Sequence, residues 1–440
     1  MAVLEYSYDY AFASTMDDRG LRWSACGGAE DVDLFFHGKL RQPRVAGQML
    51  SVLAAVVRTH FFEARPPNYD PVDTVSPASI RWEGFSGCCG AYARVDLDER
   101  SIDPEKQGFG TTNVDFNAAM TSHLARLGLR DEVELSISRD AVAVREGAEE
   151  SVERKVELPH RWIKGLSEVQ VYQAKLSPKW KVPGHRLLRF IQTTPKSGFG
   201  VQHLVQSGAS LRLTARSQSG SLAVGGVERL RTLAPLLGTN EEVAVWADDS
   251  SGVSGWQVPT AAGTFWYVLS PELQRGFSGE GQVLEALTND GWQGFADRVL
   301  EEMRGKRGCD PAEIAARLGL RTADVKATMM ALSTRGLAGY DAATGFYFHR
   351  ELPFALDKVD SQQPRLKAAR KLLAEGRVKL HERPADDAWN LLVEGDATSY
   401  FVRLRTDGDK CGCPWFSKYQ GERGPCKHLL AARLFAQRPC

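Results

Sequence analysis

The chain has 440 residues, of which 43% are hydrophobic and 25% charged, and 55 Lys and Arg residues balance 55 Asp and Glu residues. At roughly 100–200 residues per domain this length predicts two to four domains, so the chain does not need the disulfides that stabilise a mini-protein. A net charge of zero argues against a chain that is basic throughout and coats nucleic acid by electrostatic attraction alone. Any basic surface must therefore be local.

Residues 1–160 predict a mixed α/β domain. Apolar and small residues dominate 45–62, but polar residues such as Gln48 and Arg58 interrupt them. Because a membrane-spanning helix needs about 20 mostly apolar residues, we interpret 45–62 as a core helix. The first residues include the acids Glu5 and Asp9 and lack the basic and apolar regions of a secretory signal. We therefore expect a cytoplasmic protein without a membrane partner.

A second helix is predicted over 116–127, with Thr112 and Asn113 as candidate caps. The glycines of 108–113 resemble those of a phosphate-binding loop, but the Gly-Lys-Ser/Thr ending that holds phosphate and magnesium is missing. We interpret this segment as the start of a capped helix.

Residues 161–280 predict a β-rich domain. Short β-favouring runs, such as 187–193 and 264–269, are separated there by clusters of Gly, Ser and Pro. After about residue 280 the pattern changes to amphipathic helices.

Residues 281–357 resemble a winged helix-turn-helix. Asp310 and Pro311 predict the start of the second helix, and Gly336 predicts the end of the third. The predicted helices and the two strands of the wing are 295–304, 311–318, 322–335, 337–340 and 346–349.

The third helix of a DNA-binding winged helix enters the major groove. Its candidate contacts in this chain are Arg321, Thr322, Lys326, Thr328 and Arg335. Asp324 and a balance of 10 basic against 10 acidic residues over 291–360 weaken this reading. A structural or protein-docking role is therefore the alternative for this domain.

Three cysteines and a histidine cluster near the end of the chain, at Cys411, Cys413, Cys426 and His428. Three thiols and one imidazole form a common tetrahedral zinc set, and four protein ligands leave no open position for water. The cluster therefore predicts one structural Zn²⁺ ion.

The spacing of the ligands constrains the local backbone. Residues two apart on a strand share a face but stand about 6–7 Å apart, so Cys411 and Cys413 require a turn, which Gly412 allows. Positions i and i+2 of a helix point about 200° apart, so Cys426 should precede the helix 427–437 that His428 opens. The free N–H groups of that helix start can then bond a thiolate sulfur.

Basic residues surround this cluster, at Lys410, Lys418, Arg423 and Lys427. They balance the formal charge of −1 on a zinc ion with three thiolates, or they form a phosphate-binding rim. Residues 361–440 hold 15 Lys and Arg against 9 Asp and Glu, whereas residues 1–290 hold 30 against 36. This polarity restricts nucleic-acid contact to the C-terminal end.

The pattern C-x-C-x₁₂-C-x-H resembles the SWIM-type zinc finger. Upstream positions also fit, including Arg365, Leu372 and the segments 389–393 and 400–404. The resemblance implies a ββα zinc module over 361–440, after a linker at 361–364, with a role in binding DNA or protein. Segments 110–116 and 158–165 are similar to bacterial SWIM proteins that are often associated with AAA+ ATPases and von Willebrand factor A proteins.

We find little support for catalysis. The cysteines and histidines outside the cluster that could form a nucleophile and base are Cys88 or Cys89 with His37, His60, His123 or His160, but their spacing cannot show that any of them meet. We expect an α+β multidomain protein with a mixed N-terminal domain, a β-rich middle, a winged helix and a SWIM zinc finger. It is a non-enzymatic recognition protein for nucleic acid and protein, or alternatively a protein-only adaptor in an ATPase-linked assembly.

Overall fold

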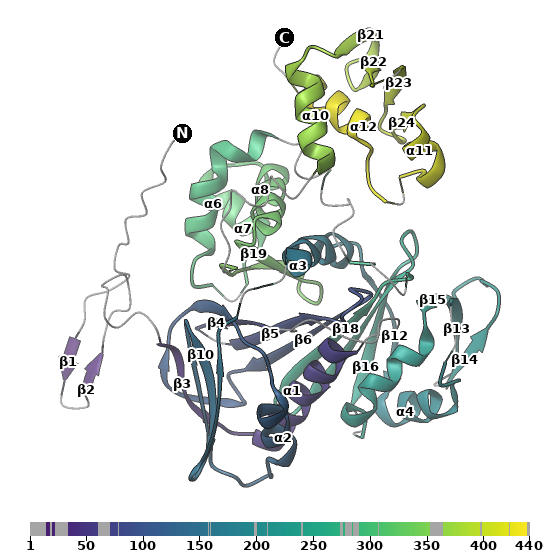
Figure 1. Cartoon of the computed structure of the whole chain (residues 1–440). Helices are drawn as coiled ribbons and strands as arrows, with labels where there is room; N and C mark the ends of the chain where they lie inside the picture. The colour runs from purple at the N-terminus through teal and green to yellow at the C-terminus, as the bar shows by residue number, and fades with distance from the viewer. Residues whose placement is uncertain are drawn as a thin grey trace.

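Figure 1 shows the computed structural model of the chain. It describes residues 15–17, 20–22, 34–59, 71–77, 79–156, 158, 160–197, 200–208, 210–238, 241–272, 276–277, 284, 290–306, 308–352, 364–396, 398–421 and 423–437. Residues 60–62 of the first predicted helix, residue 159 and residues 361–363 of the predicted linker lie outside this set. No helix of the described residues is both long and apolar enough to span a membrane.

An eight-stranded antiparallel sheet forms the centre of the chain (Figure 1). In order across the sheet its strands are β12 (Ser177–Pro183), β16 (Glu242–Asp248), β17 (Val253–Thr260), β18 (Gly263–Leu269), β6 (Ala91–Asp98), β5 (Ser79–Phe85), β4 (Val72–Ser76) and β8 (Gly110–Asn113). The pairing of β18 with β6 joins strands from both sides of the predicted boundary at residue 160. Four strands of residues 161–280 therefore belong to the same sheet as strands of the preceding residues, and the two parts share one hydrophobic core.

A five-stranded sheet and two helices accompany the central sheet. The strands run in the order β11 (Glu149–Arg154), β10 (Ala141–Glu146), β9 (Val133–Ser138), β3 (Leu34–Leu40) and β7 (Ile102–Gln107). The predicted core helix is α1 (Pro43–Arg58), which packs on β5, β6 and α2 (Ala118–Arg126). The side chain of Asn117 caps α2 by accepting the N–H groups of Ala119 and Met120. The predicted caps Thr112 and Asn113 instead lie in β8, so the interpretation of 108–113 as a helix start was wrong.

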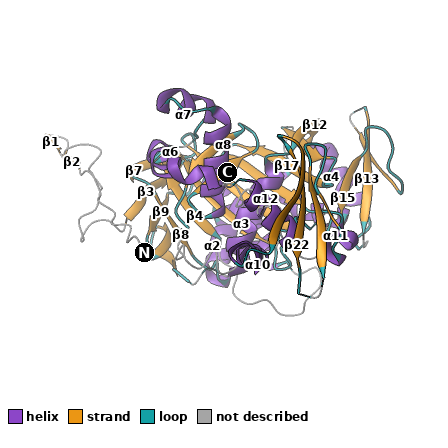
Figure 2. Ribbon diagram, turned by 90° about the horizontal axis from the view of Figure 1, so that it is seen from above, coloured by secondary structure: helices purple, strands orange, loops and turns teal. Residues whose placement is uncertain are grey.

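A smaller sheet of three strands lies at one end of the molecule (Figure 2). It contains β14 (Ser210–Thr214), β13 (Val201–Ser207) and β15 (Leu222–Gly225), next to α4 (Gly184–Thr193) and the 3₁₀ helix η1 (Val227–Leu236). The prediction of a strand over 187–193 was wrong, because this segment is the main part of α4. Leu187, Phe190 and Ile191 are its buried residues, and their spacing of three and four is that of a helix.

Residues 290–352 form a helix and hairpin module. It consists of η2 (Asp290–Phe295), α6 (Ala296–Met303), α7 (Pro311–Leu318), α8 (Thr322–Thr334), β19 (Ala338–Asp341) and β20 (Phe346–His349). The side chain of Asp310 caps α7 as the sequence predicts, and Gly336 follows α8 with a φ of 75°. Val299, Ile314, Val325 and Met329 form the core of this module.

The helix and hairpin module docks on the central sheet through buried charges. Arg81 and Glu83 alternate with apolar residues along β5, which is buried along its whole length. Glu83 accepts a hydrogen bond from Arg350, directly after β20, and Arg94 of β6 bonds Asp341 of β19 at 3.0 Å. A charge layer therefore joins the hairpin to a face of the sheet.

The helix α3 (His160–Gln173) adds a second contact to the helix and hairpin module. The Ser167 hydroxyl donates to the carbonyl of Thr334, and the Gln170 amide donates to the carbonyl of Ala338. Both carbonyls belong to the junction between α8 and β19. The end of α8 and the hairpin are thus buried against the large sheets.

The C-terminal module, residues 364–437, has its own hydrophobic core. A four-stranded antiparallel sheet is followed by the two helices that carry the ligand cluster, and Pro364, predicted as part of the linker, starts the preceding helix. The elements are α10 (Pro364–Ala374), β21 (Val378–Ala385), β22 (Ala388–Glu394), β23 (Ser399–Leu404), β24 (Lys410–Cys411), α11 (Pro414–Tyr419) and α12 (Lys427–Ala436). Helix α12 packs against all four strands of the sheet, and α10 packs on α12 (Figure 1).

The buried charges of the docking layer depend on one another. Burial alone raises the pKa of Glu83, but Arg350 and Arg81 bring the net pKa below its usual value. Burial also raises the pKa of Asp341, but Arg94 and Arg81 lower it by more, so its net pKa is below the usual value. Both carboxylates therefore stabilise the fold above their unfolded pKa of about 4, and this contribution is lost as the pH falls through their lower folded pKa.

We predict that Arg350→Met lowers the free energy of unfolding of the large sheets by about 3–5 kcal/mol, because it leaves the buried Glu83 carboxylate without its guanidinium. The double variant Glu83→Gln/Arg350→Met should lose less than the single variant, since no buried charge is then unpaired. Chemical denaturation, monitored by the fluorescence of the buried tryptophans, measures the free energy of unfolding of both variants. Equal losses in the two variants would contradict the predicted coupling.

Candidate metal centre

The four predicted ligands come from three element ends of the C-terminal module. Cys411 is the last residue of β24, and Cys413 is the N-cap of α11. Cys426 is the N-cap of α12, and His428 lies in the first turn of that helix. The sequence prediction for the second pair is confirmed, since Cys426 precedes the helix that His428 opens.

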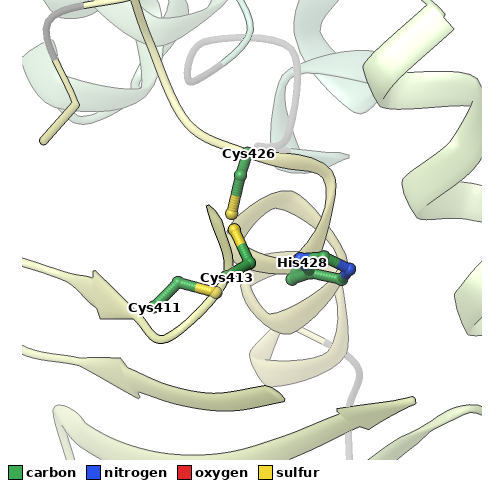
Figure 3. A group of neighbouring side chains, drawn as sticks. All are labelled: Cys411, Cys413, Cys426 and His428. Atoms are coloured by element: carbon green, nitrogen blue, oxygen red, sulfur yellow. The ribbon is translucent and has the colours of Figure 1, made fainter. Parts of the chain in front are cut away.

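The four side chains converge on one point (Figure 3). Their ligand atoms all lie within 4.8 Å of one another, and all four residues are buried. Both ring nitrogens of His428 are buried without a hydrogen-bond partner among the described residues. Zinc–sulfur bonds of about 2.3 Å in a tetrahedron place sulfurs about 3.8 Å apart, so this donor set fits one structural zinc ion.

The three thiols affect one another's protonation. A hydrogen bond with Cys426 and then burial raise the pKa of Cys411, and burial raises that of Cys413. The hydrogen bond from Cys411 lowers the pKa of Cys426 to about 4. Burial and mutual repulsion thus oppose three thiolates at one point, and a bound cation would offset both effects.

Backbone N–H groups support two of the sulfurs. The N–H of Phe416 points to the Cys413 sulfur, and the N–H of Leu429 points to the Cys426 sulfur, both at 3.4 Å. Each donor lies in the first turn of the helix that the cysteine caps, where N–H groups have no partner within the helix. The predicted thiolate contact at the start of the last helix is therefore confirmed.

The turn between the first two cysteines does not depend on the special backbone freedom of glycine. Gly412 does not have a positive φ, and a Cβ built on it would meet only the Phe401 carbonyl oxygen, at 3.9 Å. The bend instead arises because β24 ends at Cys411 and α11 begins at Pro414. The predicted turn between Cys411 and Cys413 is present, and the conformational freedom of Gly412, expected from the sequence to allow it, is not used.

Arg365 of α10 holds the loop that leads to Cys426. Its guanidinium donates to the carbonyls of Arg423 and Pro425, at 2.8 and 3.0 Å, and lies 4.8 Å from the centre of the Trp415 ring. The resemblance placed Arg365 in the scaffold, but local sequence gives no signal for a contact with residues almost sixty positions away. Sequence reasoning thus missed its role in positioning the ligand loop.

Two of the four basic residues predicted around the cluster form ion pairs within the chain. Lys427 pairs with Asp396 at 3.2 Å, and Arg423 lies 3.9 Å from Glu272. Lys418 is exposed, with its ammonium 5.1 Å from the centre of the Tyr419 ring, and Lys410 is exposed on β24. Within the described part of the chain, no ion pair involves Lys410 or Lys418.

The side chains predicted to contact DNA on and beside α8 differ in their exposure to solvent. Arg321 is exposed and pairs with Asp324 at 2.7 Å, and Lys326 is exposed. Thr328 is fully buried, and its hydroxyl donates to the Asp324 carbonyl, so it cannot contact DNA in this fold. The Arg335 guanidinium lies 4.4 Å from the centre of the Trp292 ring, within its own module.

Three of the residues considered for catalysis each contact a serine hydroxyl. Cys88 lies 3.3 Å from the Ser86 hydroxyl, His37 bonds Ser136, and His123 bonds Ser151. Among the described residues no histidine forms a hydrogen bond with Cys88, and His60 lies outside them.

Comparison with known proteins identifies the C-terminal segment. Residues 400–434 match the family model of the SWIM zinc finger, which covers all four ligands. No curated protein gives a match. Among solved structures the chain is similar to the proliferating cellular nuclear antigen from Entamoeba histolytica, at 10% identity and a TM-score of 0.38, over 54% of this chain and 99% of that one. It is also similar to A. fulgidus PCNA bound to the C-terminal region of FEN-1, at 10% identity and a TM-score of 0.37, over 54% of this chain and 98% of that one.

We predict that the purified chain contains about one zinc ion and that Cys413→Ala and His428→Ala each release it, because every ligand of a closed tetrahedral site is needed. The C-terminal module should unfold with the loss, since metal binding and folding are coupled in small zinc modules. Metal analysis and circular dichroism measure the two effects, with Cys88→Ser as the control that keeps its zinc. Full metal retention in both ligand variants would refute the ligand set.

Arg365→Met should weaken zinc binding by about tenfold, because the loop before Cys426 loses two hydrogen bonds that orient a ligand. Competition with a chromogenic chelator measures this change. Lys367→Met, an exposed position on the same helix, is the matched control and should leave zinc affinity unchanged. An equal effect of both substitutions would assign the loss to the helix rather than to the loop.

Proposed function

We propose that the chain is a non-enzymatic recognition protein that binds nucleic acid through its C-terminal module, with zinc as a structural cofactor. One observation supports this most strongly: residues 361–440 hold 15 basic against 9 acidic residues, and Lys410 and Lys418 remain exposed and without an ion pair among the described residues. Phosphate groups are the natural partners of such a surface.

The helix and hairpin module has the element order of a winged helix, but its contacts favour a docking role within the chain. The hairpin, which is the wing of such a fold, is ion-paired to the sheet through Asp341 and Arg94. The end of α8 is held by Ser167 of α3. These contacts occupy the elements that a DNA-binding winged helix places on the duplex.

The alternative function is that of a protein adaptor in an assembly with an AAA+ ATPase or a von Willebrand factor A protein. The acidic surplus of residues 1–290, with 30 basic against 36 acidic residues, favours a protein partner over nucleic acid for that part of the chain. Such an adaptor would bind no nucleic acid at low salt.

We predict that the full chain binds labelled oligonucleotides with an affinity whose logarithm falls linearly with the logarithm of the salt concentration. Lys410→Gln/Lys418→Gln should weaken binding and flatten this dependence, because two cations of the C-terminal module are lost. The matched pair Arg321→Gln/Lys326→Gln removes two cations from α8 and should change neither quantity.

Fluorescence anisotropy over a salt series makes the measurement. Absence of binding at low salt would leave the adaptor as the function. A larger effect of the α8 pair would instead assign the contact to the helix and hairpin module.

A further inference from the structure

The outer face of the four-stranded sheet in the C-terminal module lies opposite the face against which α12 packs. One row of this face crosses β21, β22 and β23 and ends at Gly412, which follows β24. Lys379 of β21 faces Leu392 of β22, Leu392 faces Phe401 of β23, and the N–H of Gly412 bonds the Phe401 carbonyl. The aromatic ring therefore stands between a leucine and a position that has no side chain.

Phe401 is open to solvent. Its side chain is 41% exposed, which is unusual for a residue at the centre of a sheet row. The ring of His381 contacts it edge-on, with centroids 5.6 Å apart and planes at 80°, and thereby fixes one side of the ring. Gly412 leaves the other side open. The result is a supported aromatic surface that a flat ligand can cover.

Two like charges lie directly opposite each other beside this ring. Arg403 of β23 pairs across the strands with Lys410 of β24, and both side chains are exposed. Like charges in this position destabilise a sheet. No ion pair involves either residue within the described part of the chain, so the repulsion has no internal compensation.

Three carboxylates of the module are engaged by other cations, and Glu382, two strands away from Arg403 in the same row, accepts a hydrogen bond from the Asn390 amide at 2.9 Å. Glu394 bonds Lys379 at 2.6 Å, Asp409 bonds Arg433 at 2.7 Å, and Asp396 pairs with Lys427. The positive charge at Arg403 and Lys410 is therefore left for an anionic ligand. That charge and the Phe401 ring lie on one face, since residues 401 and 403 are two apart on a strand.

We propose that this face binds single-stranded nucleic acid, with a base stacked on Phe401 and phosphates at Arg403 and Lys410. The inference rests on the proposed function and names its surface and ligand class. Unpaired bases stack on exposed aromatic rings in single-strand binding proteins, whereas the bases of a duplex are stacked on one another and do not offer their faces. An acidic peptide would satisfy the two cations but would leave the ring without a planar partner.

The first test measures binding of the full chain to a labelled oligothymidylate of about 16 nucleotides, within the site sizes of known single-strand binding folds. Phe401→Leu should weaken binding by about tenfold, because one stacked base is lost. The control is Phe109→Leu, since Phe109 is 39% exposed and contacts His349 at 5.7 Å with similar edge-on geometry in the N-terminal part of the chain. The affinity of the Phe109→Leu variant for the oligothymidylate should equal that of the unmodified chain.

The second test removes the two charges. Arg403→Gln/Lys410→Gln should reduce the slope of log affinity against log salt by about 1.4, because each phosphate contact to a single strand contributes about 0.7. Arg321→Gln/Lys326→Gln should leave the slope unchanged. Zinc content is measured in every variant. Gly412→Thr places a side chain beside Phe401, where a Cβ would meet only the Phe401 carbonyl oxygen at 3.9 Å, and should also weaken binding, so the test does not depend on one variant folding.

Equal affinities of the Phe401→Leu and Phe109→Leu variants would overturn this inference while the proposed function stands, as would tighter binding of a duplex of the same sequence. Displacement of the oligonucleotide by polyglutamate at equal charge would overturn it in favour of an acidic peptide. Absence of binding to any nucleic acid would overturn the proposed function and this inference together.

Discussion

The C-terminal module depends on one constraint, which is that three buried thiols and an imidazole lie within 4.8 Å of one another. A unit of this size rarely gains enough stability from its hydrophobic core alone, so a metal ion that joins distant element ends contributes directly to folding. The two cysteine caps and the Arg365 contacts position the ligands, but without a cation they would bring like charges together. The ion therefore fixes α11 and α12 relative to β24 and the rest of its sheet.

Charged side chains are buried and paired in the helix and hairpin module, whereas those of interest in the C-terminal module are exposed. In the helix and hairpin module, Arg350, Glu83, Arg94 and Asp341 are buried and paired, so they join the hairpin to the large sheets. In the C-terminal module, Arg403 and Lys410 are exposed and face each other across two strands. The first arrangement gives a fixed internal interface, whereas the second leaves charge for an external ligand. This contrast explains why we assign recognition to the C-terminal module.

The sequence predicted the parts of the fold that depend on local signals. Asp310 and Pro311 mark a helix start through their own backbone chemistry, and the ligand spacing determined how Cys426 and His428 sit on α12. Long-range pairing could not be predicted, since nothing in residues 263–269 shows that β18 adds to β6 and extends one sheet across a supposed domain boundary. The docking of the buried charges of β5 also gave no signal, because Asp341 and Arg350, their partners in the helix and hairpin module, lie more than 250 residues away. The segment 187–193 shows a different failure, in which β-favouring residue types concealed a helical spacing.

The central claim is that zinc holds the C-terminal module in the form that binds nucleic acid. The most direct test is oligonucleotide binding by the full chain before and after zinc is removed with a chelator and then restored. We predict that binding is lost with the metal and recovered when about one equivalent of zinc is returned, because the sheet and its ligand helices refold around the ion. Unchanged affinity in the metal-free chain would contradict the account.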